Sequence, residues 1–144
     1  MVAIKTEISD PNARTFRFGR QKTMYGGRKI AAGDTLFIFA SENEGGSGLV
    51  ALGRVTSAVA VPRKPGVERQ TPRVSVVVVR TALARRAPGR RELKPYSDWD
   101  DGKPQTELNF KFYRQATNKI VGLSARASRF LRGYFQVQAQ RKSR

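Results

Sequence analysis

The chain has 144 residues, enough for one domain with a real core, and no apolar run long enough to cross a membrane. It contains neither histidine nor cysteine, which excludes Ser-His hydrolases, cysteine nucleophiles, disulfides and the commonest zinc ligands. Its 28 Lys and Arg outnumber 11 Asp and Glu, for a formal net charge of +17, and a field that strong attracts polyanions, nucleic acid first of all.

The first part of the chain alternates between strand and turn signals. Residues 2–8 alternate apolar and polar side chains, which predicts a half-buried strand. Phe16 and Phe18 alternate with arginines, a pattern typical of rings that reach the core, although it also suits base stacking between phosphate contacts. Residues 21–30 contain paired glycines, which favour a short helical turn and a loop.

Residues 33–54 predict a central antiparallel hairpin. The apolar run at 36–39 does not alternate, so its strand is buried on both faces or lies in a small barrel. The glycine-rich insert at 45–48 supplies the backbone angles that a reversal needs. Gly53, inside the returning strand, indicates a bulge or a close backbone approach.

Two basic loops and another strand follow the hairpin. Residues 55–61 continue the returning strand, and 62–66 form an exposed basic loop with two prolines. The β-branched run 74–79 predicts a further central strand. Residues 85–91 hold four arginines and predict a loop or hairpin tip that contacts phosphates or is simply solvated.

The last part of the chain predicts one strand and one helix. Trp99, the only tryptophan, stands among three aspartates whose spacing does not fit a calcium loop, so no metal site and no cofactor is predicted. Residues 106–115 alternate and predict a strand. Ser124 predicts the N-cap of a helix with an apolar stripe and an arginine face. Residues 1–136 are expected to form the single domain, and 137–144 a basic flexible tail.

Three stretches occur in an informative order. Ile4-Lys5-Thr6-Glu7 resembles a first strand that ends in Lys-Ser-Glu, and AGDTLFIF at 32–39 with GLVALGRV at 48–55 resembles a "GD…FY, then G-I-V-G" hairpin. Phe112-Tyr113-Arg114-Gln115, followed by Leu123-Ser124, resembles an Arg-Gln strand leading into a final helix. Together they resemble the EVE domain, a member of the PUA-like superfamily that includes YTH and ASCH domains. The chain departs from that family at 18–25, where a Trp-rich segment with an Arg-Asn pair is replaced, and it lacks the proline after Lys-Ser-Glu.

The resemblance implies an α+β fold: a five- to six-stranded, mostly antiparallel curved pseudobarrel with short helices and a C-terminal helix. It also implies a module that reads a modified or flipped base of DNA or RNA in a cleft. We expect this module to be non-catalytic, and the lack of cysteine is compatible with a cytoplasmic or nucleoid-associated protein. The predicted partner is either nucleic acid, without preference between them. Because flipping a base out of a duplex costs a few kcal/mol, a single-stranded, damaged or modified base is favoured.

A pocket between the first strand and the 106–115 strand is expected to hold the base. The residues predicted to hydrogen-bond its edge, stack on it or line the pocket are Lys5, Thr6, Tyr25, Trp99, Arg114, Gln115 and Asn118. The predicted phosphate contacts are Arg17, Arg20, Lys22, Arg28, Lys29, Arg85, Arg86, Arg90, Arg91, Arg126 and Arg129.

Two alternative functions stay open. An ASCH-like amidohydrolase or nucleotide-processing enzyme would draw its reacting groups from Lys5 or Lys22, Thr6 or Thr23, and Glu7. Gly19-Arg20-Gln21-Lys22-Thr23 comes close to the ASCH pattern G-x-K-T-x-E-x-R, but no glutamate follows before Glu42, so a non-enzyme is preferred. The other alternative is a protein-interaction module whose charge is incidental.

Overall fold

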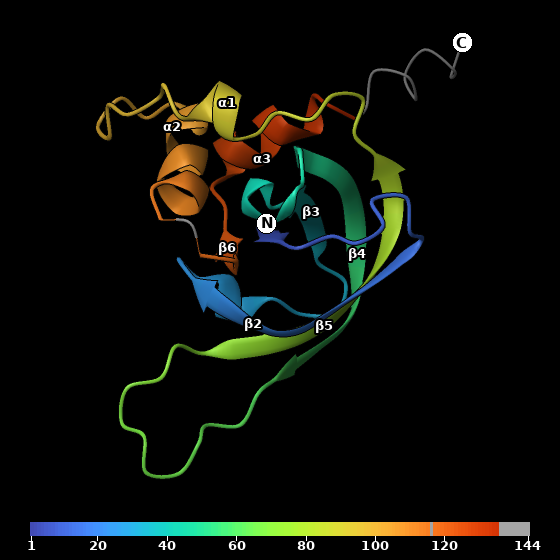
Figure 1. Cartoon of the computed structure of the whole chain (residues 1–144), viewed down its shortest axis with the longest axis vertical. Coiled ribbons are helices and arrows are strands. Elements are labelled where there is room, and N and C mark those ends of the chain that lie inside the picture. Colours follow the sequence, from blue (N-terminus) through green and yellow to red (C-terminus); the bar gives the residue numbers. More distant parts are fainter. Residues whose placement is uncertain (116, 136–144) are drawn as a thin grey trace.

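Six strands close into a barrel in the computed structural model, which describes residues 1–115 and 117–135 (Figure 1). The strands are β1 (Val2–Thr6), β2 (Thr15–Met24), β3 (Thr35–Ala40), β4 (Gly48–Ala60), β5 (Arg73–Leu83) and β6 (Lys119–Gly122). Their order around the barrel is β1-β3-β4-β5-β2-β6, with β1 parallel to β3, β2 parallel to β6, and the other neighbours antiparallel. Closure gives every strand a neighbour on both sides, and β2 meets β6 through Thr23 and Met24 alone.

The strands β1 and β3 are buried on both faces because they separate two apolar clusters. Ile4 and Ile38 belong to the cluster that fills the barrel, whereas Ala3 and Phe37 belong to the cluster shared with the helices. Residues 36–39 are therefore buried on both faces of β3, as their continuous apolar pattern predicted. The half-buried strand predicted at 2–8 is wrong: β1 ends at Thr6 and all five of its residues are buried.

The central hairpin is confirmed. Strands β3 and β4 pair antiparallel up to Ala40 and Gly48, and the 3-10 helix η2 (Glu42–Glu44) lies in the connection between them. Gly48 has φ 93°, and a Cβ there would lie 2.5 Å from the carbonyl oxygen of Pro88, so only glycine fits. The predicted irregularity at Gly53 is also present, as a register shift between β4 and β5.

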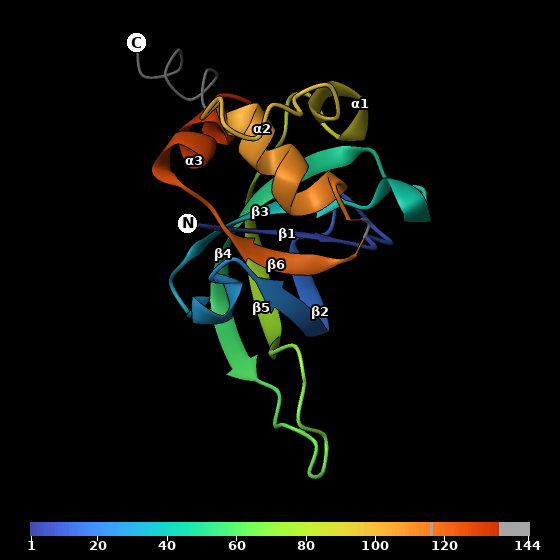
Figure 2. The same cartoon turned by 90° about the vertical axis from the view of Figure 1, so that its left-hand side faces the viewer.

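Short helices cover one side of the barrel (Figures 1 and 2). They are α1 (Arg90–Leu93), α2 (Pro104–Leu108), the π-helix η3 (Asn109–Tyr113) and α3 (Ala125–Arg132). The helix predicted after Ser124 is confirmed, and the Ser124 hydroxyl accepts a hydrogen bond from the Ala127 N–H at 3.1 Å. Among the residues the structure describes, no helix has the length and apolar character needed to cross a bilayer.

The strand predicted at 106–115 is wrong, because this segment is helical. Pro104 starts α2 at a position where its missing N–H costs nothing. Leu108 and Phe112 are fully buried at helical i, i+4 spacing, whereas Phe110 is only partly buried. A strand here could not pair with β1, because β1 already pairs with β3 on one side and β6 on the other.

Two further boundaries differ from the sequence predictions. Strand β2 continues to Met24, because Thr23 and Met24 pair with β6, and the helical turn predicted at 21–30 is reduced to the 3-10 helix η1 (Gly27–Lys29). The basic loop predicted at 85–91 ends in α1, which begins at Arg90. The predicted tail, 137–144, lies outside the described residues.

Candidate nucleic-acid interface

Two exposed aromatic rings pack against Phe110, which belongs to η3. The side chains of Tyr25 and Trp99 are 42% and 45% exposed, and their ring centroids lie 5.7 Å and 5.4 Å from that of Phe110. Tyr25 has φ 53°, a left-handed conformation that is uncommon for an aromatic residue. These three rings are called the aromatic ridge below.

Two cations lie against the aromatic ridge. The Arg114 guanidinium carbon is 4.8 Å from the Phe110 centroid and 5.8 Å from that of Trp99. The Lys111 ammonium is 5.8 Å from the Tyr25 ring. Beside the ridge is a hollow of about 250 Å³ lined by Trp99, Gly102, Lys103, Thr106, Glu107 and Phe110. Exposed rings next to a guanidinium form a surface on which a nucleobase can stack while a phosphate is held nearby.

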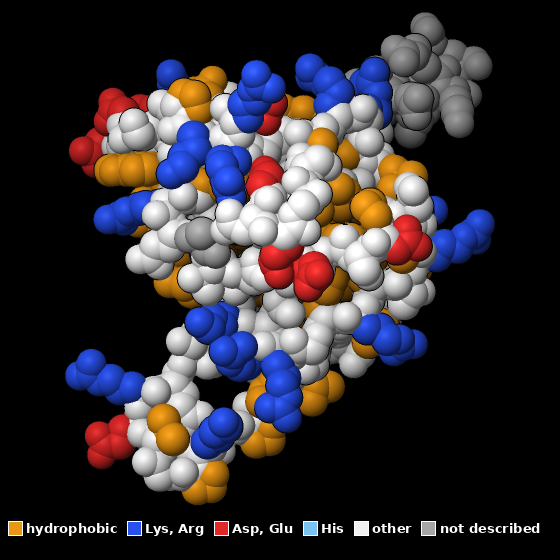
Figure 3. Space-filling view, in the orientation of Figure 1, with side chains coloured by type: hydrophobic (Ala, Val, Ile, Leu, Met, Phe, Trp, Pro, Cys, Tyr) orange, Lys and Arg blue, Asp and Glu red, His pale blue; other side chains and the backbone are white. Residues whose placement is uncertain are grey.

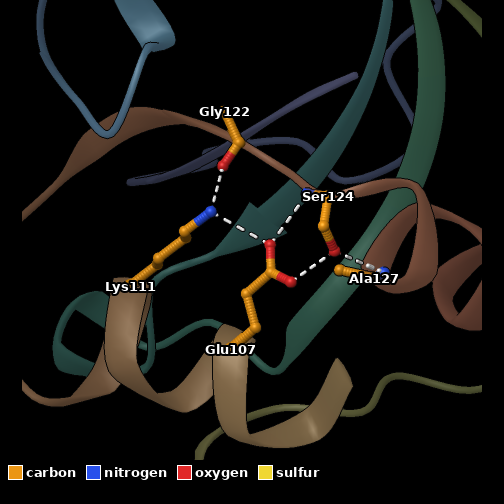
Figure 4. Close-up of polar contacts among 5 residues, drawn as sticks. All are labelled: Glu107, Lys111, Gly122, Ser124 and Ala127. Carbon is orange, nitrogen blue, oxygen red and sulfur yellow. Dashed lines mark hydrogen bonds and ion pairs between the residues drawn. The ribbon is translucent and has the colours of Figure 1, made fainter. Parts of the chain in front are cut away.

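A polar network fixes the helix that carries the ridge (Figure 4). The Glu107 carboxylate accepts hydrogen bonds from the Lys111 ammonium at 3.0 Å, from the Ser124 N–H at 2.8 Å, and from the Ser124 hydroxyl. Lys111 also donates to the Gly122 carbonyl at 2.7 Å. Burial alone would raise the pKa of Glu107, but these donors outweigh it and hold that pKa below its ordinary value. The network therefore ties η3 to the junction of β6 and α3.

Two lysines are buried opposite each other in the pairing of β1 with β6. Lys5 is 0% and Lys119 1% exposed. The Lys119 ammonium donates to the carbonyls of Thr117 at 3.0 Å and Gln115 at 3.3 Å. The Lys5 ammonium has no hydrogen-bond partner within the described residues and lies 5.5 Å from the Tyr113 ring. Burial lowers the pKa of both, and with the neighbouring charges of Lys5 and Lys22 it brings the pKa of Lys119 to about 8.

Acidic side chains of η2 lie near Lys5. The Tyr113 hydroxyl donates to the Glu42 carboxylate at 3.1 Å, and burial followed by that negative charge raises the pKa of Tyr113. Glu44 accepts a hydrogen bond from the Asn118 amide at 2.8 Å. Figure 3 shows acidic side chains near the middle of this face of the molecule, with Lys and Arg above and below them.

The structure divides the predicted pocket residues into three groups. Tyr25, Trp99 and Arg114 meet at the aromatic ridge, and Gln115 is exposed directly after Arg114. Lys5 and Thr6 are buried in β1. Asn118 is bound to Glu44. Phe110, which contacts both other rings, was not predicted, because the alternating pattern of 106–115 indicated a strand. The spacing of four residues between Glu107 and Lys111 was the signal in the sequence that favoured a helix.

A second concave surface lies between β2 and the connection of β4 to β5. It is a hollow of about 700 Å³. Its lining includes no carboxylate and six cations, namely Arg20, Lys22, Arg28, Arg63, Lys64 and Arg73. This surface is called the basic groove below. Figure 3 shows Lys and Arg side chains on both sides of the gap between the barrel and the projecting loop.

Three of the predicted phosphate contacts, Arg20, Lys22 and Arg28, converge on the basic groove. The others are spread over the surface. Arg17, Lys29 and Arg129 are exposed elsewhere, and Arg126 donates to the Gly102 carbonyl. Arg85 and Arg86 lie near Tyr134. Arg90 and Arg91 line a hollow that also contains Glu42 and Glu92. Within the described residues, no group of three or more His, Cys, Asp or Glu is arranged to hold a metal.

Solved structures of similar fold include two of one human protein. The DUF55 domain of human thymocyte nuclear protein 1 superposes with a TM-score of 0.60 at 18% identity, over 90% of this chain and 94% of that chain. Human THYN1 in complex with DNA containing 5-methylcytosine gives 0.62 at 19% identity, over 90% and 93%. A Pseudomonas syringae protein gives 0.55 at 16% identity, over 90% and 96%.

Neither a family model nor a curated protein matches the sequence. The likeness to solved structures, together with the closed and mostly antiparallel six-stranded barrel, confirms the predicted PUA-like pseudobarrel fold.

Proposed function

We propose that this chain is a non-catalytic nucleic-acid-binding module that stacks a base on the aromatic ridge. The observation that carries the proposal is the pair of exposed rings, Tyr25 and Trp99, each packed against Phe110, with the Arg114 guanidinium over Phe110 and Trp99. Large apolar rings gathered at one exposed place are typical of a binding surface. A stacked base would cover them and contribute about 1–3 kcal/mol per base.

The ligand class is supported by a protein of the same fold. Human THYN1 was solved in complex with DNA containing 5-methylcytosine. We therefore propose a modified or unpaired base as the stacked group, since such a base is the least costly to remove from its neighbours. Arg114 and the exposed Gln115 beside it are the proposed contacts to the base edge or its phosphate. Lys5 and Thr6 are buried and take no part in this contact.

The amidohydrolase alternative receives less support from the geometry. Its reacting set needs an accessible lysine and hydroxyl, but Lys5 and Thr6 are buried. In the second possible set, the Thr23 hydroxyl already donates to the Pro72 carbonyl at 2.8 Å. Neither pair is presented to a substrate in the way that nucleophilic catalysis requires.

The proposal is tested by titrating labelled oligonucleotides, single-stranded and duplex, with and without 5-methylcytosine. Because Trp99 is the only tryptophan, its fluorescence reports contact at the ridge directly, and stacking is expected to quench it. Trp99→Ala should weaken binding about 5- to 150-fold, the equivalent of ~1–3 kcal/mol.

The slope of log affinity against log salt should be unchanged in Trp99→Ala, because a ring makes no ionic contact. Leu83→Ala removes an equally exposed apolar side chain at the end of β5 and is the matched control. Unaltered binding by Trp99→Ala, or equal losses in the two variants, would contradict stacking on the ridge.

A further inference from the structure

We infer that the basic groove is a second contact surface, which clamps the phosphodiester backbone of the same nucleic-acid strand whose base stacks on the aromatic ridge. This inference rests on the proposed function and adds the path of the strand. The lining of six cations without a carboxylate, around about 700 Å³, concentrates positive potential between two walls. The regularly spaced negative charges of a nucleic-acid backbone match a lining with several separate cations.

One wall of the groove is built around a strained residue. The pairing of β2 with β5 shifts register between Phe18 and Gln21, and within this bulge Arg20 has φ 51°. The Arg20 N–H donates to the Ser75 hydroxyl at 3.0 Å, and its carbonyl accepts from the Arg73 guanidinium at 2.7 Å. Bulges re-aim side chains, and a left-handed conformation outside glycine persists only when neighbours enforce it. Arg20 is therefore held in the groove lining by β5.

The other wall is a loop that the protein braces itself. The loop at 61–72 projects from the barrel beyond the ends of β4 and β5 (Figures 1 and 2). The Gln70 amide accepts from the Lys64 N–H and donates to the carbonyls of Lys64 and Val67, each at 2.8 Å. The Arg63 guanidinium donates to the Glu68 carbonyl at 2.8 Å. A wall ordered before binding loses less conformational entropy when a ligand arrives.

A short segment of chain joins the groove to the ridge. Lys22 and Arg28 line the groove, and Tyr25, which lies between them in sequence, belongs to the aromatic ridge. The segment is anchored at Gly27, whose backbone packs so closely on β6 that a Cβ there would clash with the Ile120 carbonyl. Figure 2 shows β2 between the helices that carry the ridge and the projecting loop. A strand crossing this segment would place a base at Tyr25 and its phosphates at the groove cations.

This continuity favours nucleic acid over an acidic protein as the occupant. An acidic peptide would satisfy the groove cations but would have no planar group for the ridge beside them. The two occupants are distinguished by competition: poly-glutamate at equal charge concentration should fail to displace the oligonucleotide, and displacement would overturn the inference.

The decisive variant is Arg28→Gln combined with Lys64→Gln, which neutralises one cation on each wall. Neither side chain makes a hydrogen bond within the described residues, so the fold should be retained, as checked by urea unfolding. The salt slope should fall by about 1.4–1.8, that is ~0.7–0.9 for each lost phosphate contact. Arg28→Lys with Lys64→Arg keeps the charges and should restore most of the slope.

The matched control is Arg54→Gln combined with Arg69→Gln, which removes the same charge from exposed positions outside the groove lining. It should leave the slope within about 0.5 of the unmodified protein. If the groove variant and this control lose equal slope, or if the groove variant loses none, the clamp is refuted while the ridge proposal stands. If the unmodified protein binds no oligonucleotide, or Trp99→Ala binds normally, the proposed function itself fails.

Discussion

Replacing Lys5 with methionine is expected to stabilise the fold. Its ammonium is 0% exposed and has no hydrogen-bond partner within the described residues. An unpaired buried polar group costs about 1–3 kcal/mol, and the nearby negative charge of Glu42 offsets part of this cost. Methionine has a similar length and fills the same space, so the packing loss is small. We expect Lys5→Met to raise the free energy of unfolding by ~1–2 kcal/mol near neutral pH, or about 4 °C in Tm per kcal/mol.

The pH dependence gives a second, independent readout. Burial lowers the pKa of Lys5 in the folded state below its ordinary 10.5. At a pH between the folded-state pKa and 10.5, the unfolded chain binds more protons than the folded chain. The free energy of unfolding therefore rises as the pH increases toward 10.5. Lys119, with a folded pKa of about 8, adds a rise of the same sign from about pH 8 upward. In Lys5→Met the rise should be smaller, because one lysine is gone and the pKa of Lys119 returns toward normal.

The assay is urea unfolding of both proteins at about pH 7 and about pH 9.5, analysed by linear extrapolation. Lys111→Met is the matched control, because that ammonium is paired with Glu107 and bound to the Gly122 carbonyl. The same substitution there should destabilise. The reasoning is refuted if Lys5→Met loses more than about 1 kcal/mol near pH 7, or if its stability rises with pH as steeply as that of the unmodified protein.

Three further outcomes are expected from urea unfolding. Phe112→Ala should cost ~3–5 kcal/mol and Phe110→Ala far less, because the Phe112 ring is fully buried and the Phe110 ring is not. Equal costs would instead indicate a strand at 106–115, in which both rings point to the same face. Gly27→Ala should cost about 1–3 kcal/mol, because the added methyl group would clash with the backbone of β6. Gly19→Ala is the control and should be nearly neutral, because the space around Gly19 is open. A neutral Gly27→Ala would mean that η1 does not pack against β6. Ser124→Ala should cost ~1–2 kcal/mol by removing the N-cap of α3 and a donor to Glu107, and no change would show that the network in Figure 4 does not support the helix.

Local pattern predicted the elements whose signals are strong over a short distance. The hairpin at 33–54 combines a continuous apolar run with a glycine-rich reversal, and the helix after Ser124 combines a cap with an apolar stripe. The segment 106–115 failed for the opposite reason. Residues 108, 110 and 112 are apolar, which fits a period of two, yet 108 and 112 also fit a helical face, and only the closed barrel decides between them.

The candidate site was predicted in part. Tyr25, Trp99 and Arg114 were named from the sequence and meet at the aromatic ridge, and whether they bind a base stays a prediction. Lys5 and Thr6 were placed in the same pocket, but β1 buries them because both of its faces are covered. Nothing local in the sequence distinguishes a lysine on a strand with one covered face from a lysine on a strand with two.

The sequence by itself determined the properties that depend on composition and near neighbours: the strong positive charge, the absence of histidine and cysteine chemistry, the central hairpin and the final helix. The tertiary structure alone decided which cations converge on one surface and which lysines are buried. Arg20 and Arg28 reach the same groove as Lys64 because β2 pairs with β5, and the register of that pairing contains a bulge. Strand register follows from contacts between residues far apart in the chain, and a shift of one residue moves every side chain to the other face.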